Sequence, residues 1–553
     1  MTTGTAIRQR NLDRVQKEQY DAIIVGAGIN GAGIARDATM RGLKVLLLEK
    51  GDIGEGTTAW STRLIHGGLR YLEHYEIPLV RESLRERELL FRHAPHLVRP
   101  LPFVVPIYKS GKRPPWLIRM GMLGYDALSF DRSVPGHRML DTDATLRRVP
   151  GINSDGLRGA ATYYDGQVEF PERVSVENAL SASDHGANVL TYTRVDDLVM
   201  VNKRLAGVVF TDLLDDNQQQ HTVHAPLTIN VTGPWVDRLA GQVSDQRYIG
   251  GTKGSHIIVE KFPGAPTSAI YVENEADGRP YFIVPWNGLY LIGTTDFRYT
   301  GDLDRVIADD DEIDYLIADT NRVIPGAGLG REHVLYTYSG VRPLPYEEEG
   351  AESGITRQHI VRDHAPEVHG LISIIGGKLT TYRNLAEQAV DLAFRKLGRP
   401  DPGCRTARVP FPGANTDDFN RFLAEFRVWS SLPPRTAERL ISIYGTQVRP
   451  LLDRSRETPH LLEPIEGAPH TIQGEVPFAF DYEAAQTLTD VLMRRTMLGF
   501  SRDNAVAAVE HVARLAAEHN GWTDDRKQDE INRYFAYLER FRSRAAGETA
   551  VRQ

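Results

Sequence analysis

The chain has 553 residues, of which 41% are hydrophobic and 25% charged, with a formal net charge of −8. This length exceeds one ordinary hydrophobic core and predicts two or three domains, while the acidic balance argues against nucleic acid as a partner. The single cysteine, Cys404, excludes an internal disulfide and an iron–sulfur or structural zinc site of the Cys-x-x-Cys kind, and no metal site is predicted. A reducing, cytoplasmic setting fits this composition.

The start of the chain and its longest apolar runs bear on localisation. Residues 1–19 are polar and charged, lack the apolar stretch of a secretory signal, and predict a disordered N-terminal arm. No run approaches the ~20 apolar residues that cross a bilayer. Any contact with a membrane is therefore predicted to be peripheral.

The segment 20–49 has the pattern of a dinucleotide-binding unit. An apolar run at 22–25 and a second at 45–48 flank a helical segment, whose first turn reads Gly26-Ala27-Gly28-Ile29-Asn30-Gly31. Glycines permit a tight turn and close approach of a pyrophosphate to the helix N-terminus, and an acid ending the second strand binds ribose hydroxyls. Glu49 lies 49 − 26 = 23 residues after Gly26, near the usual ~20. The unit predicts a bound adenine dinucleotide and leaves NAD and FAD open.

Further along the chain, the pattern alternates between helical and β-like segments. Apolar spacing over 77–92 predicts an amphipathic helix. The β-branched and aromatic runs within 187–232 and 257–295 predict a sheet-rich substrate domain. A Pro- and Gly-containing loop at 409–413 then precedes residues of mostly helical character, including an amphipathic run over 504–517, and predicts a domain boundary.

Two later strands also run into glycine turns. One turn contains Thr232 and Gly233, and the other contains Gly377, Lys378 and Leu379. A helix starting at Lys378 would point its positive end at the pyrimidine edge of a flavin, where negative charge accumulates on reduction. Together with the first unit, the two turns favour FAD over NAD.

Several longer motifs resemble FAD-dependent glycerol-3-phosphate dehydrogenase. They follow the same order over almost the whole chain and end in Asp490–Thr496. They are the run Ser61-Thr62-Arg63-Leu64-Ile65-His66-Gly67-Gly68-Leu69-Arg70-Tyr71-Leu72-Glu73, Lys253-Gly254-Ser255-His256, Leu291-Ile292-Gly293-Thr294-Thr295-Asp296, Ser339-Gly340-Val341-Arg342-Pro343-Leu344, and Gly376-Gly377-Lys378-Leu379-Thr380-Thr381-Tyr382-Arg383.

The resemblance implies a fold and a reaction. The expected fold class is α/β plus α: a Rossmann-like FAD-binding domain of the glutathione-reductase and D-amino-acid-oxidase type, an antiparallel substrate sheet and a C-terminal helical domain. The expected oxidoreductase region is 20–408, with FAD-binding parts at about 20–95, 150–250 and 340–400 and substrate- or membrane-facing parts at about 96–149 and 251–339; the helical domain is 409–553. The implied reaction oxidises sn-glycerol 3-phosphate to dihydroxyacetone phosphate and passes electrons from the flavin to a membrane quinone. A homodimer at the inner face of the plasma membrane is also implied.

The resemblance also assigns site residues by position. The implied substrate-binding residues are Arg70, Tyr71, His256, Arg342, Arg357 and Lys378, and the implied catalytic residues are His256, Arg342 and Lys378. The cofactor-binding set comprises Gly26, Gly28, Ile29, Asn30, Gly31, Glu49, Ser61, Thr62, His66, Gly67, Gly68, Thr232, Gly233, Gly377, Lys378, Leu379 and Thr380. These types suit the chemistry, because arginine forks bind phosphate and cations favour a developing alkoxide.

Oxidation of a secondary alcohol requires a base that removes the hydroxyl proton. We assign this role to His256, with His66 as the main rival, because imidazole exchanges protons near neutral pH. The acceptor is also open: a glycerol-3-phosphate oxidase would use the same scaffold to reduce oxygen to peroxide, and a non-catalytic flavin-binding sensor is the third hypothesis. The chain departs from the family in the longer stretch Val168–Arg173 and in Trp60, a bulky residue expected to alter flavin packing.

The segment 109–123 combines cations with tryptophan and aliphatic side chains. Such a surface suits anionic lipid headgroups and shallow insertion. The alternative is an interior helix or a subunit contact. We therefore expect either an anionic membrane surface or protein to cover this segment.

Overall fold

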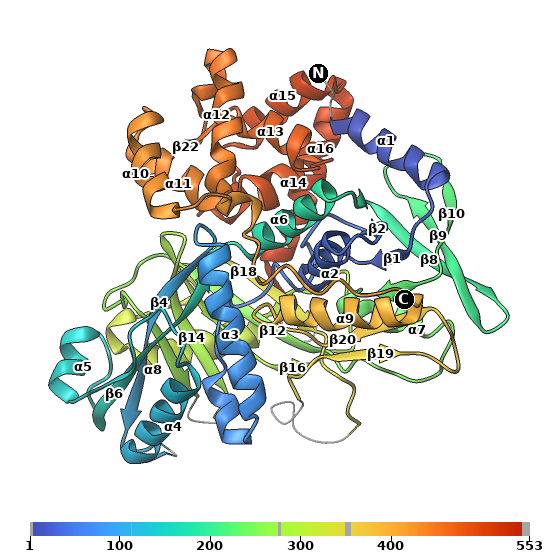
Figure 1. The fold of residues 1–553 in the computed structure, drawn as a ribbon. Helices are drawn as coiled ribbons and strands as arrows, with labels where there is room; N and C mark the ends of the chain where they lie inside the picture. Colours follow the sequence, from blue (N-terminus) through green and yellow to red (C-terminus); the bar gives the residue numbers. More distant parts are fainter. Residues whose placement is uncertain (1–3, 112, 275–277, 349–355, 545–553) are drawn as a thin grey trace.

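The computed structural model describes residues 4–111, 113–274, 278–348 and 356–544, without the side chains of residues 4–6, 70, 73, 74 and 544. Figure 1 shows an α/β body with helices of the C-terminal part packed above it. The α/β plus α fold class predicted from the sequence is confirmed.

The N-terminal segment is helical where the sequence predicted disorder. α1 spans Gly4–Lys17. Arg8 donates two hydrogen bonds of 2.8 Å to the carboxylate of Asp212, and Val15 is buried against the neighbouring sheet. The prediction of a disordered arm over residues 1–19 was therefore wrong for residues 4–17, and residues 1–3 lie outside the described part. The anchoring contacts are distant in sequence, so the local composition did not reveal them.

The dinucleotide-binding unit belongs to a six-stranded sheet. Its strand order is β19 (Ile360–Asp363), β20 (Leu371–Ile375), β11 (Thr228–Asn230), β1 (Ala22–Val25), β2 (Val45–Leu48) and β7 (Asn188–Leu190). All neighbours are parallel except β19 and β20. The carboxyl ends of β1, β11 and β20 share one edge, so the three predicted glycine turns that follow these strands meet there.

Both faces of this sheet are covered, which explains why its strands are continuous apolar runs. On one face Ile24 and Leu47 pack with helices, namely α2 (Ile29–Met40), α6 (Pro171–Asp184) and α9 (Tyr382–Leu397). On the other face Ile23 and Leu46 pack with Phe210 and its neighbours in a three-stranded sheet of β8 (Thr193–Val201), β9 (Arg204–Asp212) and β10 (Gln220–His224). This packing fixes the positions of α2 and α9, which follow two of the glycine turns, relative to the strands.

A second, ten-stranded sheet forms the rest of the α/β body. Its main path is β16 (Phe297–Arg298), β12 (Thr252–Val259), β15 (Leu289–Gly293), β14 (Pro280–Trp286), β13 (Ala269–Glu273), β4 (Val98–Tyr108), β6 (Leu157–Val168) and β3 (Leu64–Ile65). β18 (Val334–Arg342) pairs with β12, and β5 (Arg138–Leu140) pairs with β6. The pairing of β12 and β18 is antiparallel and sets His256 opposite Tyr338.

Two helices flank this sheet near the site. α3 spans Ile77–His93, which confirms the amphipathic helix predicted over 77–92. α4 spans Pro115–Leu128 and lies beside both α3 and the short 3₁₀ helix η1 (Leu69–His74). Both α3 and α4 therefore lie next to η1, which carries Tyr71.

The C-terminal part is helical, as predicted. It contains α10 (Phe419–Trp429), α11 (Pro434–Tyr444), α12 (Val448–Glu457), α13 (Glu475–Tyr482), α14 (Leu488–Asp490), α15 (Val509–Asn520) and α16 (Asp524–Leu538). The predicted run over 504–517 becomes regular helix only at Val509, because Asn504 and Ala505 adopt positive φ angles of 50° and 57°. After α16 the chain returns to the α/β body, where β23 (Ser543–Arg544) pairs with β17 (Ala308–Asp309).

Candidate active site

Two adjoining cavities lie at the edge where the three glycine turns meet. The larger, of about 340 Å³, is lined by the turns after β1, β2 and β11, and the smaller, of about 230 Å³, lies toward β12 and the end of β18. Their shared walls are formed by Thr57, Trp60, Ser61, Gly340, Pro343, Gly377, Lys378 and Leu379. We call the larger cavity the cofactor cleft and the smaller one the substrate chamber.

The first glycine turn is shaped for close approach of a ligand. Gly26 has φ +105°, and a Cβ atom there would lie 2.6 Å from the carbonyl oxygen of Val231. A Cβ on Gly31 would lie 1.8 Å from the carbonyl oxygen of Gly26. Both positions therefore require glycine, and they set the N-terminus of α2 beside the cleft, where a pyrophosphate binds favourably.

Glu49 ends β2 and lines the cofactor cleft, as the sequence predicted. Its carboxylate accepts hydrogen bonds from the backbone N–H of Ala27 at 2.6 Å and of Gly51 at 3.0 Å. Burial raises the pKa of this carboxyl above its ordinary value. Glu49 therefore also fixes the turn between β1 and α2, in addition to being placed to meet ribose hydroxyls.

Most of the predicted cofactor-binding residues line one of the two cavities. The cofactor cleft is lined by Gly26, Gly28, Ile29, Asn30, Glu49, Ser61, Thr232, Gly233, Gly377, Lys378 and Leu379, and the substrate chamber also by Thr62, His66 and Thr380. Gly31, Gly67 and Gly68 line neither cavity. Their contribution is to packing: a Cβ on Gly67, for example, would lie 2.2 Å from the hydroxyl of Tyr125 on α4.

The loop around Gly67 is held by a single carboxylate oxygen. Asp165 Oδ1 accepts hydrogen bonds from the Gly67 N–H at 3.0 Å, from the Tyr125 hydroxyl at 2.8 Å and from Arg87 Nη1 at 2.8 Å. Arg87 belongs to α3 and Tyr125 to α4. The oxygen therefore ties two helices to the loop that carries His66.

His256 lies on β12, is buried and lines the substrate chamber. Its Nε2 atom is 2.9 Å from the hydroxyl oxygen of Thr62. Burial, with the nearby charges of Arg342 and Arg63, lowers the pKa of His256 well below 6.5. The ring is therefore neutral near pH 7 and able to accept a proton.

His66, the rival base, lines the same chamber. Burial lowers the pKa of His66 as well, so this ring too is neutral. The two predicted proton acceptors thus face one chamber, together with Tyr71 of η1. The side chain of Arg70, the other substrate residue expected on η1, lies outside the described part.

Two of the predicted substrate-binding residues, Arg342 and Arg357, are brought together by one carboxylate. Arg342 Nη1 donates to Asp296 Oδ1 at 3.0 Å, and Arg357 Nη2 donates to Asp296 Oδ2 at 3.3 Å. Arg342 also donates to the hydroxyl of Thr294 at 3.1 Å. Both guanidinium groups line the substrate chamber. Asp296 is the last residue of one of the family-like motifs, but the sequence alone did not predict a role for it.

Lys378 lines both cavities and carries a buried Nζ atom that makes no hydrogen bond to any described residue. This atom lies 4.0 Å from the centre of the Tyr71 ring. Burial lowers the pKa of Lys378 to about 7, although the carboxylates of Glu82 and Glu76 oppose the shift. A buried cation without a hydrogen-bonding partner fits an anionic ligand in the cavity.

The residues in the departing stretch Val168–Arg173 are structural anchors. Glu172 accepts hydrogen bonds from Arg63 at 2.9 and 3.0 Å, and Arg173 donates to Glu483 of the C-terminal part at 2.5 and 2.9 Å. Both pairs are buried. Sequence reasoning also missed Arg540, which lines the cofactor cleft from the far end of the chain, because no glycine turn or other local signal surrounds it.

Comparison with known families matches two successive parts of the chain. Residues 21–383 match the family described as FAD dependent oxidoreductase, and residues 404–527 match the C-terminal domain of alpha-glycerophosphate oxidase. The first match includes the three glycine turns and the two arginines of the substrate chamber, Arg342 and Arg357. The second covers most of the C-terminal helices.

Individual relatives extend over nearly the whole chain. A glycerol-3-phosphate dehydrogenase from Synechocystis is 46% identical, over 96% of this chain and 98% of the relative. A D-erythritol 1-phosphate dehydrogenase from Brucella abortus is 37% identical, over 87% of this chain and 95% of the relative. The solved glycerol-3-phosphate dehydrogenase from Bacillus halodurans, complexed with FAD, is 28% identical with a TM-score of 0.80, and the match covers 98% of each chain.

Proposed function

Because the chain belongs to the family of FAD-dependent oxidoreductases that continue into the C-terminal domain of α-glycerophosphate oxidase, we propose that it oxidises sn-glycerol 3-phosphate to dihydroxyacetone phosphate. FAD is the cofactor. The observation that carries this proposal is the cationic substrate chamber that adjoins the dinucleotide cleft, with Lys378 lining both cavities.

The charges of the chamber suit a phosphate dianion. Three positive charges line the chamber when Lys378 is protonated, the other two being those of Arg342 and Arg357. The carboxylate of Asp296, which pairs with both arginines, offsets one of these charges. Two arginine forks can share the oxygens of one phosphate and hold it in a fixed orientation. We therefore assign phosphate binding to Arg342 and Arg357, which leaves the polyol carbons toward Lys378 and the histidines.

The proton of the substrate hydroxyl passes to a neutral imidazole, which we assign to His256. Its buried ring lies beside Thr62, and its lowered pKa keeps it deprotonated before the substrate binds. Lys378, when protonated, favours the negative charge that develops on the oxygen. Bound FAD supplies the acceptor for the hydride that leaves the carbon.

The electron acceptor is proposed to be a membrane quinone. Exposed apolar side chains lie on α4, at the start of α3 and in the turns that follow η1 and α4. α4 contacts η1, which carries the chamber residue Tyr71. This apolar patch consists of Tyr75, Ile77, Trp116, Leu117, Met120, Leu123 and Phe130. Its exposure argues against the interior helix that was one alternative for segment 109–123. Of the two remaining contacts, a lipid surface and a second subunit, we propose the lipid surface.

The proposal places the protein at the cytoplasmic face of the membrane, as a peripheral homodimer. The apolar patch and nearby Arg119 suit an anionic membrane surface. Arg113, another cation of this segment, donates to Glu273 at 2.6 Å, and Lys112 lies outside the described part. Within the described ranges, no helix has the length and apolar composition needed to span a bilayer. The dimer rests on the family resemblance alone.

Anaerobic reduction of the FAD-loaded protein tests the reaction. Glycerol 3-phosphate should bleach the oxidised flavin absorbance, and erythritol phosphate should do so more slowly if the chamber selects a three-carbon chain. A flavin that neither substrate reduces would leave the sensor hypothesis. After reduction, rapid reoxidation by a soluble quinone analogue with little peroxide formed in air supports the dehydrogenase, whereas stoichiometric peroxide without quinone supports the oxidase.

A further inference from the structure

The end of the described chain lies along the cofactor cleft. After α16, the 3₁₀ helix η11 (Glu539–Phe541) leads into β23, which pairs in parallel with β17 of the α/β body. We call residues 539–544 the C-terminal strap. Its position brings a segment of the helical part to a cofactor cleft that is otherwise built from the α/β body.

Arg540 of the strap lines the cofactor cleft. Its guanidinium carbon lies 4.8 Å from the Trp60 ring centre and 4.4 Å from the Tyr537 ring centre. The Nη1 atom is buried and donates no hydrogen bond within the described ranges, and it lies 3.9 Å from Glu55 Oε1. A cation that is held by ring faces and by a carboxylate at ion-pairing distance still has an unused buried donor, Nη1, for an anion.

The strap is fixed firmly enough to position this arginine. Phe541 is buried, with its ring centre 5.8 Å from that of Trp60, and its carbonyl oxygen accepts a hydrogen bond from Thr337 at 3.2 Å. Trp60 lines both the cofactor cleft and the substrate chamber. Trp60, the bulky residue that departs from the family pattern, thus contacts two residues of the strap, Arg540 and Phe541.

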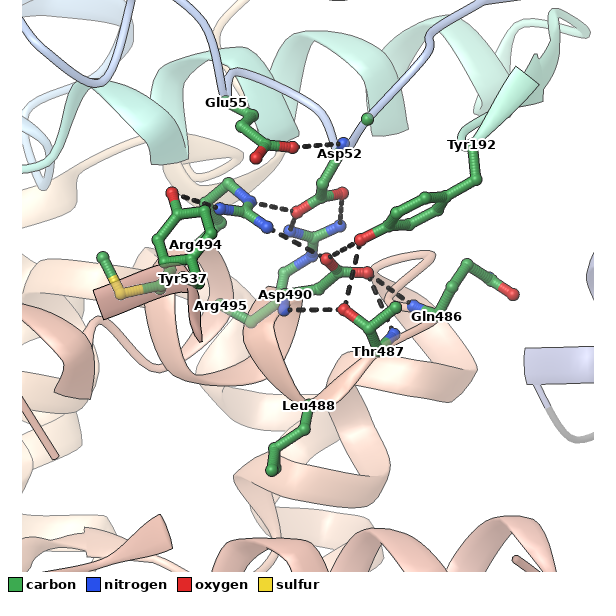
Figure 2. A network of polar contacts seen from close by, with 12 residues as sticks. Asp52, Glu55, Tyr192, Gln486, Thr487, Leu488, Asp490, Arg494, Arg495 and Tyr537 are labelled. Atoms are coloured by element: carbon green, nitrogen blue, oxygen red, sulfur yellow. Dashed lines mark hydrogen bonds and ion pairs between the residues drawn. The ribbon is translucent and has the colours of Figure 1, made fainter. Parts of the chain in front are cut away.

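The loop opposite Arg540 is also held by the C-terminal part, as Figure 2 shows. Asp52, fully buried, accepts hydrogen bonds from Arg494 at 2.5 Å and from Arg495 at 2.8 and 2.9 Å. The Asp52 N–H donates to Glu55 Oε2 at 3.0 Å. Arg494 in turn donates to the Tyr537 hydroxyl at 3.3 Å. The residues around Glu55 and those next to the strap are therefore both hydrogen-bonded to Arg494 and Arg495 or to residues that these arginines hold.

We propose that Arg540 is a cofactor-binding residue supplied by the C-terminal helical part, so that FAD binding and docking of the strap stabilise each other. The dinucleotide carries the negative charge of its pyrophosphate into a cleft where Arg540 presents a cation. A ligand that contacts the strap only when the strap is docked must favour the docked state by the same factor. This inference rests on the FAD binding of the proposed function.

The dissociation constant of FAD from the apoprotein tests the inference. Arg540→Ala should raise it about ten- to hundred-fold, the usual effect of losing one charge-assisted contact. Arg540→Gln, which keeps the length of the side chain and is less disruptive to folding, should raise it comparably. Arg542→Ala is the matched control, because Arg542 lies in the same strap with a side chain that is 75% exposed, and it should leave the constant unchanged.

Hydrogen exchange provides a second measurement that does not depend on turnover. FAD should slow amide exchange in residues 539–544 of the wild-type protein, and this protection should be lost in Arg540→Gln. Constants within twofold of wild type for both Arg540 variants, with unchanged strap protection, would overturn the inference. A wild-type apoprotein that takes up no FAD would instead contradict the proposed function.

Discussion

Asp296 Oδ1 lies 3.0 Å from Arg342 Nη1, so the cation that we assign to phosphate binding is already held by a carboxylate. The second oxygen of Asp296 holds Arg357 at 3.3 Å. Two flexible side chains are therefore ordered before the substrate arrives, which lowers the entropy lost on binding. Asp296 also offsets part of the charge of the two arginines, whose side chains are 28% and 20% exposed.

Removal of the Arg342 guanidinium should weaken phosphate binding. Arg342→Ala should lower kcat/KM for glycerol 3-phosphate by about thirty- to two-hundred-fold, which corresponds to about 2–3 kcal/mol for a charge-assisted pair. Steady-state kinetics with a quinone analogue measure this effect, which should appear largely in KM. Arg362→Ala, an exposed arginine on β19, should leave both constants unchanged; an equal loss in both variants would contradict the assignment.

His256 should act on the chemical step more than on binding. His256→Asn should slow anaerobic flavin reduction by about 10²- to 10⁴-fold, the usual contribution of a general base, while the substrate dissociation constant changes little. Stopped-flow absorbance at saturating substrate measures the rate. His66→Asn is the comparison variant, and a larger loss there than in His256→Asn would transfer the role to His66.

Lys378 should impose a pH dependence on the free enzyme. Its pKa of about 7 means that the ammonium is present below neutral pH and is lost as the pH rises through that value. We therefore expect kcat/KM to fall on the alkaline side of about pH 7. Lys378→Arg should remove this limb at a lower maximal rate, because a guanidinium stays charged throughout. A limb that persists unchanged in this variant would assign it to another group.

Asp52 should contribute strongly to stability, because it compensates two buried arginines. Asp52→Asn should lower the free energy of unfolding by about 3–5 kcal/mol, as expected when a buried pair loses one partner. Burial alone would raise the pKa of Asp52, but Arg495 and Arg494 lower it to about 2. Its stabilisation is thus complete above the ordinary pKa of 3.8 and is lost as the pH falls toward 2.

Urea unfolding of the FAD-loaded protein measures this loss, and Asp52→Asn should also flatten the acid limb of stability. The matched control is Glu425→Gln, which breaks an exposed pair with Arg421 that is 2.8 Å long. An exposed helical pair contributes little to stability, because the solvent screens its charges. Equal midpoints for Asp52→Asn and the wild type would show that the arginines find other partners.

The apolar patch should bind lipid vesicles. Trp116→Ser combined with Met120→Ser should weaken co-sedimentation with anionic vesicles at least tenfold, since each buried apolar side chain contributes about 1.5–3 kcal/mol. Val428→Ser removes an apolar side chain on α10 that is more exposed than either of these residues, and it should have no effect. Unchanged vesicle binding in the double variant would exclude α4 as the contact.

The sequence specified the local parts of the site better than the distant ones. Gly26 and Glu49 were found because a tight turn and a strand-ending acid leave a short-range pattern, and the resemblance located His256 and Arg342. Arg540 and the helix around Arg8 were missed, because their roles arise from contacts with residues hundreds of positions away. Asp165 was missed for the same reason, because the three groups that donate hydrogen bonds to it come from separate parts of the chain.

Those three donors give Asp165 a mechanical consequence. If α4 settles into a lipid headgroup layer, any tilt of the helix pulls on the Tyr125 hydroxyl, and the same oxygen anchors the Gly67 amide next to His66. A displacement of α4 would thereby reach the loop of His66 through two hydrogen bonds to a single oxygen. Attachment and turnover would then be adjusted together rather than independently.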